Sequence, residues 1–323
     1  MTFLNRRQVM GSLATWATLG AAPAWSQASY PSQPLRFIVP YPAGGATDAL
    51  ARLVAQKLQD AWQQTVVVEN KPGAGGTIGA NLVAKGPTDG HTVLFTIVAL
   101  LQQMTLMKLP YDPIKDFAPI TRVAISPSVF AADPALPVQN LADFIRLVKS
   151  QPGKYNYGTY GPGTSAHLQG ELLKLQTGVD LVHVPFQGAS PLVASMLGGQ
   201  LSSAFLDAGS SRQHLSKFKL LGVTGSERLS WLPQVPTLKE QGLHSYEPMG
   251  WFGLFLPAGV PASVQEKLSN EAQRILRLPE VREKIEAMGL IPGGESVDAF
   301  AKVIKSDADI YARIIREAKI SLQ

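Results

Sequence analysis

The sequence predicts an α/β protein made of two lobes. Short apolar runs, each long enough for one buried strand, alternate with segments whose apolar residues recur at helical spacing. Glycine-rich turns join a strand to a helix in both halves of the chain, and 323 residues suffice for two domains. Such alternation favours mostly parallel sheets with helices on their faces, and two lobes of this kind suggest a cleft between them.

The first half of the chain begins with a strand, a glycine turn and a helix. Residues 35–39 predict a buried strand, which two prolines end because proline cannot donate to a sheet ladder. Gly44 and Gly45 accept a positive φ without a Cβ penalty, so the backbone can turn sharply. N–H groups at the start of the helix that follows attract a carboxylate or phosphate. The alternative is a plain N-cap at Thr47 or Asp48 with nothing bound.

The same periodicities predict the remaining elements. Further strands are expected at residues 65–69, 91–98, 128–132, 155–158, 201–206, 220–224 and 250–257, and residues 182–189 repeat the pattern of a strand followed by a turn. Further helices are expected at residues 80–85, 140–149, 168–176, 190–197, 264–276, 279–288 and 297–319. The turn at 70–79 is rich in glycine but lacks the G-K-[ST] ending of a P-loop, so nucleotide binding is not expected. The turn at 159–167 is a second anion-ready helix start.

Residues 1–28 have the pattern of a secretory signal peptide. Arg6 and Arg7 precede an acid-free apolar run, and small residues follow at the expected cleavage site, with Ser26 and Ala28 at positions −3 and −1. We therefore expect export to the periplasm. The paired arginines leave the twin-arginine and Sec routes both open. An uncleaved anchor is less favoured because the run is short for a membrane span.

The composition excludes several classes of function. The chain has no cysteine, hence no disulfide and no thiol nucleophile. Its formal charge of +5 falls to +3 without residues 1–28, which hold two arginines and no acid. No Lys/Arg cluster indicates a nucleic-acid partner. The five histidines are scattered without an H-x-x-x-H pair, so neither a metal site nor a cofactor is expected.

Six motifs, in order, resemble those of the tripartite tricarboxylate transporter receptors, the Bug-type solute-binding proteins. They are Val39-Pro-Tyr-Pro-Ala-Gly-Gly-Ala-Thr-Asp48, Glu69-Asn-Lys-Pro-Gly-Ala-Gly-Gly-Thr-Ile-Gly79, Tyr157-Gly-Thr-Tyr-Gly-Pro-Gly-Thr-Ser-Ala-His-Leu168, His183-Val-Pro-Phe-Gln-Gly-Ala189, Trp231-Leu-Pro-Gln-Val-Pro-Thr-Leu238 and Trp251-Phe-Gly-Leu-Phe-Leu-Pro-Ala-Gly259. The resemblance covers nearly all of the chain after residue 28. It implies a periplasmic binding protein type II fold, whose two α/β lobes close on a small carboxylate held by backbone N–H groups and ordered waters.

The resemblance also implies the ligand-binding residues. One set lies on the first-lobe turn, residues 41–48: Tyr41, Pro42, Ala43, Gly44, Gly45, Ala46, Thr47 and Asp48. The other lies on the second-lobe loop, residues 159–167: Thr159, Gly161, Gly163, Thr164, Ser165 and His167. Nearby positions complete the predicted site: Thr96, Gln187, Gly188 and Asp207.

One segment departs from the family pattern. The family commonly has a small or polar stretch after the third strand, where this chain has Thr96-Ile-Val-Ala-Leu-Leu-Gln-Gln-Met104. The segment is either ordinary core or an apolar wall of the pocket. The second interpretation would argue against a short citrate-like ligand.

The predicted function is a periplasmic receptor that delivers its carboxylate to the membrane subunits of a tripartite tricarboxylate-type transporter. We expect a monomer, with residues 29–127 and 250–323 in the first lobe and residues 128–249 in the second. One alternative is an exported hydrolase or lyase that uses Asp48, His167 and Asp207, although Ser165 does not sit in a G-x-S-x-G motif. Another is a subunit that presents its ligand to a membrane kinase.

The signal-peptide pattern makes a testable prediction. Cleavage after Ala28 leaves Ser29 as the first residue of the exported protein. Intact-mass and N-terminal peptide spectrometry of periplasmic protein measures this directly. A terminus at Met1 would contradict the prediction, whereas a terminus at Trp25 would move the cleavage site to the second candidate.

Overall fold

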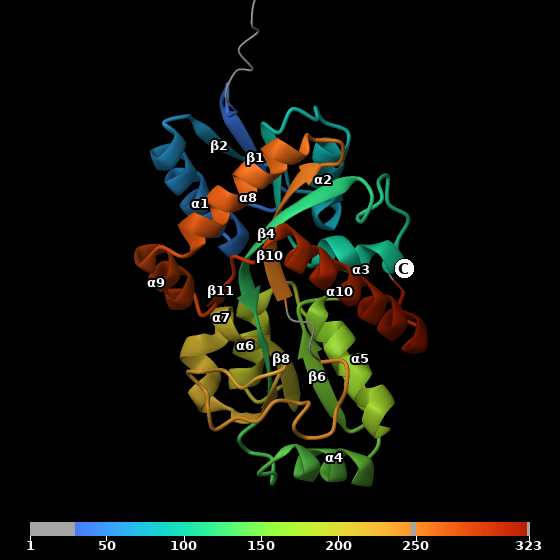
Figure 1. Ribbon diagram of the computed structural model, residues 1–323. Helices are drawn as coiled ribbons and strands as arrows, with labels where there is room; N and C mark the ends of the chain where they lie inside the picture. The colour runs from blue at the N-terminus through green and yellow to red at the C-terminus, as the bar shows by residue number, and fades with distance from the viewer. Residues whose placement is uncertain (1–29, 247–249, 322–323) are drawn as a thin grey trace, which may run out of the picture.

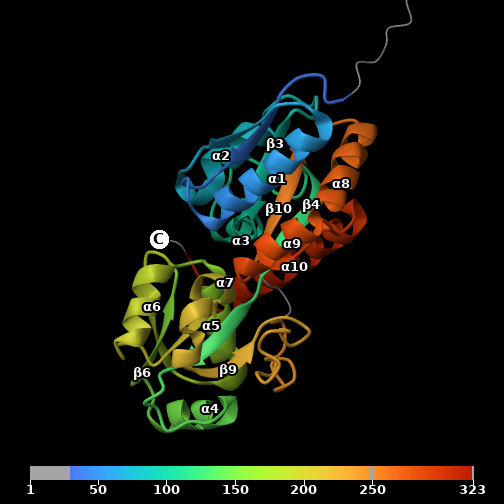
Figure 2. The same ribbon diagram turned by 90° about the vertical axis from the view of Figure 1, so that its left-hand side faces the viewer.

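The computed structural model describes residues 30–246 and 250–321, which form two α/β lobes stacked end to end (Figure 1). The predicted signal peptide lies outside the described residues. No helix in the described part of the chain combines the length and apolar character that a membrane span requires. Each lobe has one sheet with helices packed against it, as Figure 2 shows from the side.

The first lobe is built on a six-stranded sheet in the order β11-β4-β10-β3-β1-β2. Strands β1, β2 and β3 are parallel, whereas β10 runs antiparallel to β3 and β4. The strands are β1 (Leu35–Val39), β2 (Val66–Asn70), β3 (Thr92–Ile97), β4 (Phe117–Ser126), β10 (Gly250–Pro257) and β11 (Ile291–Pro292). The helices of this lobe are α1 (Ala46–Trp62), α2 (Thr77–Ala84), α3 (Ala99–Leu106), α8 (Ala262–Leu276), α9 (Pro279–Ala287) and α10 (Val297–Glu317).

The second lobe is built on a five-stranded sheet in the order β7-β6-β8-β5-β9. Strand β6 is parallel to β7 and β8, and β5 is antiparallel to β8 and β9. The strands are β5 (Ser128–Ala132), β6 (Tyr155–Thr159), β7 (Leu181–Pro185), β8 (Ser203–Asp207) and β9 (Lys219–Val223). The helices are α4 (Leu141–Ser150), α5 (Ser165–Thr177), α6 (Ala189–Leu197) and the single turn α7 (Ala208–Ser211).

The two lobes share one arrangement of strands and helices. In the first lobe β1, β2 and β3 each lead into a helix, and the three strands lie in the order β2-β1-β3. In the second lobe β6, β7 and β8 each lead into a helix, and they lie in the order β7-β6-β8. Helices that follow parallel strands begin at the same edge of the sheet, so each lobe gathers its helix starts at one edge.

The chain passes between the sheets at Pro127, which separates β4 from β5. The backbone N–H of Ala208 donates to the carbonyl of Pro127 at 2.9 Å. The return crossing includes residues 247–249, which lie outside the described residues. We propose that the two sheets are the cores of a discontinuous first lobe, 29–127 with 250–323, and an inserted second lobe, 128–249.

Strands β4 and β11 and helices α3 and α7 are not among the elements expected from the sequence. Strand β4 was not predicted, because Pro119 interrupts its pattern and proline is unfavourable inside a sheet. The register of β4 against β10 shifts between Leu254 and Phe255, the residue opposite Pro119, and this irregularity accommodates the proline. Helix α3 was not predicted either, because Val98 stands at its N-cap position and supplies no capping side chain.

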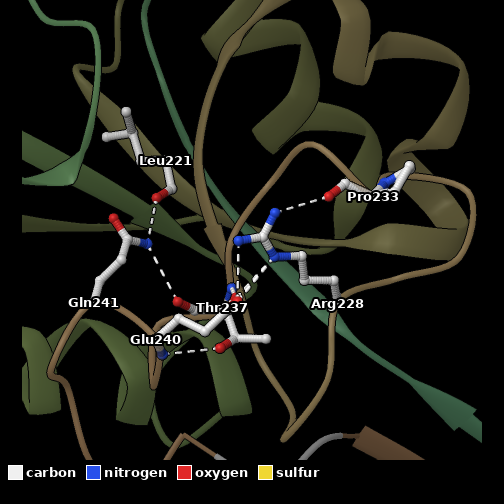
Figure 3. Close-up of polar contacts among 6 residues, drawn as sticks. All are labelled: Leu221, Arg228, Pro233, Thr237, Glu240 and Gln241. Atoms are coloured by element: carbon white, nitrogen blue, oxygen red, sulfur yellow. Dashed lines mark hydrogen bonds and ion pairs between the residues drawn. The ribbon is translucent and has the colours of Figure 1, made fainter.

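A network of polar contacts fastens the long segment that follows β9 (Figure 3). The carboxylate of Glu240 accepts from the Arg228 guanidinium at 3.0 Å and from the Thr237 backbone N–H at 2.6 Å. The backbone N–H of Glu240 donates to the Thr237 hydroxyl at 3.0 Å. The Gln241 amide donates to the Leu221 carbonyl of β9 at 2.9 Å. These bonds hold an irregular segment against the outer strand of the second sheet.

Helix α10 lies where the two lobes meet and packs against α3, β4 and α5 (Figure 1). Its Asp307 is buried and accepts from the indole N–H of the equally buried Trp251 at 3.0 Å. Burial raises the pKa of the Asp307 carboxyl group to about 6. The folded state therefore favours the protonated form, and the stability that this group contributes is lost as the pH rises through about 6.

This buried pair predicts that one substitution changes the pH dependence of stability and that another lowers stability itself. Asp307→Asn keeps an acceptor for the indole and removes the buried charge, so stability should fall less between pH 5 and pH 8 than in the wild type. Asp307→Ala strands the indole N–H and should lower the free energy of unfolding by about 1–3 kcal/mol. Urea unfolding at both pH values tests this, with the exposed Asp309→Asn on the same helix as control. An equal pH response in Asp307→Asn and wild type would contradict the prediction.

Candidate functional site

A cavity of about 380 Å³ lies between the two lobes. Four helices of eight or more residues begin at it. Their contributing residues are Ala46 and Thr47 for α1, Val98 and Ala99 for α3, Thr164, Ser165 and Ala166 for α5, and Gly188 and Ala189 for α6. The remaining walls come from Ile97, Gln102, Ser126, Ser128, Tyr160, Asp207, Ser210, Gly250, Trp251 and Phe252.

The four longer helices that start at the cavity have no side-chain caps. The first N–H groups of any helix lack an acceptor within that helix. Away from the cavity, Asn140 and Ser296 accept from these groups at α4 and α10, whereas α2, α8 and α9 have no side-chain cap either. Within the described chain, no side chain does so at α1, α3, α5 or α6. The cavity therefore receives hydrogen-bond donors and the positive ends of helix dipoles from both lobes.

The first-lobe turn is held from behind by Asp48. One oxygen of its carboxylate accepts from the backbone N–H of Gly44 and from Arg52, both at 3.0 Å, and the other accepts from Asn70 at 3.0 Å. The hydrogen bond from Arg52 is the main cause that lowers the pKa of Asp48. The N–H of Gly44 is thus occupied, and Ala46 and Thr47 are the residues of this helix start that line the cavity.

The glycines of this turn differ in conformation. Gly44 has a φ of +85°, as the sequence predicts for a sharp turn. Gly45 has a φ of −81° and a ψ of 171°, so it is extended and the expected positive φ is wrong there. The left-handed Gly44 alone reverses the chain direction. Gly45 then takes the extended conformation of a helix N-cap, from which α1 begins. A Cβ on Gly45 would meet nothing nearer than the Pro42 carbonyl oxygen at 3.8 Å.

The second-lobe loop is held by hydrogen bonds among its own residues. The Thr164 hydroxyl donates to the Gly161 carbonyl at 2.7 Å, and the backbone N–H of Gly163 donates to Nδ1 of His167 at 3.0 Å. Gly161 and Gly163 have φ values of +120° and +74°, which favour glycine. Helix α5 begins at Ser165, three residues before the predicted start, because this folded loop leads directly into it.

Two histidines lie behind the loop. The rings of His167 and His183 stack 4.0 Å apart with 8° between their planes, and Nε2 of His183 lies 2.7 Å from the Thr159 hydroxyl. Burial lowers the pKa of both rings, and the neighbouring His167 further lowers the pKa of His183, to about 4. Because Nδ1 of His167 accepts from Gly163, the neutral form of this ring is required for the loop as it stands.

Asp207 ends β8 at the cavity, as the sequence suggested. Its Oδ1 accepts from the backbone N–H of Ser210 at 2.8 Å and so caps α7, while its Oδ2 accepts from the Ser126 hydroxyl of the first lobe. The Asp207 backbone N–H donates to the Tyr160 hydroxyl. Asp207 is the one charged residue in the described lining of the cavity.

The structure brings some of the predicted site residues to the cavity and places the others around it. Those that line it are Ala46, Thr47, Thr164, Ser165, Gly188 and Asp207. The others lie outside the lining: Tyr41, Pro42, Ala43, Gly44, Gly45, Asp48, Thr96, Thr159, Gly161, Gly163, His167 and Gln187. Several of these shape the two loops, as the contacts of Asp48 and His167 show. Of the acid–base residues considered for an enzyme, only Asp207 lines the cavity.

Sequence reasoning missed several lining residues. The buried Gln102 donates to the Ser165 hydroxyl at 2.8 Å and so links α3 of the first lobe to α5 of the second. Ile97, Val98 and Gln102 belong to the segment that departs from the family pattern, and this departure was the available signal. The segment fits both interpretations, since these residues line the cavity while Leu100 and Leu101 are core.

Within the described residues, no group of three or more histidine, aspartate or glutamate side chains is placed to hold a metal ion.

The histidine pair predicts acid sensitivity. The lowered pKa of His183 means that the unfolded state binds more protons below pH 6.5, so stability present above that pH is lost as the pH falls towards 4. His183→Gln should therefore show a smaller drop in melting temperature from pH 7 to pH 4.5 than the wild type. The exposed His244→Gln is the matched control and should behave like the wild type. An unchanged drop in His183→Gln would contradict the prediction.

Comparisons with known proteins identify the family and the fold. Residues 50–320 match the family model described as "Tripartite tricarboxylate transporter family receptor". The periplasmic binding protein BugD is 31% identical, with a TM-score of 0.73 over 91% of this chain and 100% of its own. R. palustris Rpa4515 with adipate is 30% identical, with a TM-score of 0.77 over 91% and 100%. MatC from Rhodopseudomonas palustris with bound malate is 28% identical, with a TM-score of 0.72 over 88% and 100%. These matches confirm the predicted two-lobe binding-protein fold, and the matched proteins are solute-binding proteins rather than enzymes.

Proposed function

Because the chain belongs to the tripartite tricarboxylate transporter receptor family, we propose that it is a periplasmic receptor for a small organic carboxylate. It captures the carboxylate between its two lobes and delivers it to the membrane subunits of a transporter of that type. The exported chain begins after the signal peptide and acts as a monomer. The resemblance to BugD, a periplasmic binding protein, supports the location.

One observation carries the proposal: uncapped helix starts from both lobes meet at one cavity. A carboxylate there accepts from the N–H groups of Ala46 and Thr47 in the first lobe, or from those of Ser165 and Ala166 in the second. Hydrogen bonds to a charged acceptor are shorter and stronger than neutral ones. The helix dipoles supply the positive potential, so the site needs neither lysine nor arginine.

Two structural neighbours support a carboxylate as the ligand. Rpa4515 is described with adipate and MatC with bound malate, and both acids carry carboxylates. The proposed residues are those predicted from the sequence, with the lining members in contact with the ligand and the others holding the loops. A ligand that bonds to both lobes favours their closed arrangement, because only that arrangement offers both sets of donors.

Binding is tested first by thermal unfolding with mono-, di- and tricarboxylates and aromatic acids. A ligand of the folded state alone stabilises it by about 2.7 kcal/mol at 100-fold excess over Kd. We expect at least one acid to raise the melting temperature, and mass analysis to recover it unchanged. Turnover of the acid would favour the enzyme alternative, and the absence of any shift would overturn the proposal.

The role of backbone donors is tested by replacing the first residue of a helix. Ala46→Pro removes one N–H at a position that proline fits well, after an extended Gly45. Since a hydrogen bond to a charged group contributes about 1.5–3 kcal/mol, affinity should fall roughly tenfold or more. Ala262→Pro makes the same change at the exposed start of α8 and should bind normally. Equal affinities of the two variants, both with normal melting, would show that the carboxylate does not rest on α1.

A further inference from the structure

The cavity between the lobes has an unequal distribution of charge. In its described lining Asp207 is the one charged side chain, and it is negative. Asp48, close to the first-lobe end, has its charge paired with Arg52 and does not line the cavity. An anion in the cavity is therefore opposed beside Asp207, which ends β8 of the second lobe, and meets no charged side chain of the described lining at the start of α1.

Asp207 is the last residue of β8 in the second lobe, and its carboxylate also accepts from Ser126 of the first lobe. Its backbone N–H donates to the hydroxyl of Tyr160, a residue of the loop that leads into α5. Its carboxylate accepts from the Ser126 hydroxyl and from the backbone N–H of Ser210, and both are neutral donors that do not cancel its charge. A carboxylate of the ligand placed at this end would face a like charge, whereas a hydroxyl or methyl group would not.

The walls between the two ends are largely apolar. Ile97 at the end of β3 and Val98 at the N-cap of α3 contribute apolar side chains to the lining. Trp251 and Phe252 of β10 do the same. Such walls favour contact with hydrocarbon or an aromatic ring over contact with additional polar groups.

We propose that the ligand is a monocarboxylate with an apolar body, held by its carboxylate at the start of α1 and by an uncharged end beside Asp207. This inference rests on the proposed function and specifies its substrate class. The second lobe already contains its own carboxylate in Asp207, so a dicarboxylate would place two like charges at the same end. A terminal hydroxyl is accepted there because it can donate to Asp207.

Matched acids test the inference by titration calorimetry. Hexanoate and 6-hydroxyhexanoate are compared with adipate, and 4-methylbenzoate is compared with terephthalate. Each monocarboxylate should bind at least tenfold more tightly than its dicarboxylate partner. Equal or tighter binding of the dicarboxylates would overturn this inference and leave the proposed function intact. Failure of every acid in the thermal screen would overturn both.

A charge substitution tests the role of Asp207. Asp207→Asn removes the charge but keeps a side chain that caps helices well, so melting should be close to that of the wild type. The preference for hexanoate over adipate should shrink at least threefold. Asp180→Asn makes the same change in net charge at an exposed position before β7 and should keep the full preference. An unchanged preference in Asp207→Asn, with adipate still weak, would overturn the assignment of selectivity to Asp207.

Discussion

Unpaired backbone N–H groups at helix starts are the constraint on which this structure depends. They cannot be satisfied within their own helices, and in both lobes the parallel strands direct the following helices to one edge of the sheet. When the two edges face each other, the donors meet at a cavity that has no lysine or arginine in its described lining. The anion recognition that we propose would thus come from the topology of two small sheets rather than from charged side chains.

The loops that present these donors could largely be predicted, because their signals are local. Prolines after Val39 and the left-handed Gly44 determine the first-lobe turn, and left-handed Gly161 and Gly163 determine the second-lobe loop. The end of β8 at Asp207 could be read in the same way from a short apolar run and one acid. The same local signals did not distinguish residues that reach the cavity from those that hold a loop, such as Asp48 and His167.

The rest of the site could not be predicted, because it depends on contacts between distant parts of the chain. Gln102 stands in an apolar segment with no motif, and only the packing of α3 and α5 against α10 brings it to Ser165. Ser126 ends β4, a strand that was not predicted because it contains Pro119. It reaches Asp207 only because the chain crosses between the sheets at Pro127. The indole N–H of Trp251 donates to Asp307, which is 56 residues away in the sequence, and this bond helps to orient the ring at the cavity.

Among the described lining residues, two hydrogen bonds join the lobes at the cavity: Gln102 to Ser165, and Ser126 to Asp207. A typical hydrogen bond contributes about 0.5–1.5 kcal/mol net, and somewhat more when one partner is charged. Contacts of this size bias the arrangement of the lobes without locking it. A ligand can shift the arrangement only by binding one state more tightly than the other. A carboxylate that accepts from the start of α1 while its body packs on Trp251 and reaches Asp207 would meet this condition, because it joins the same two lobes that these hydrogen bonds join.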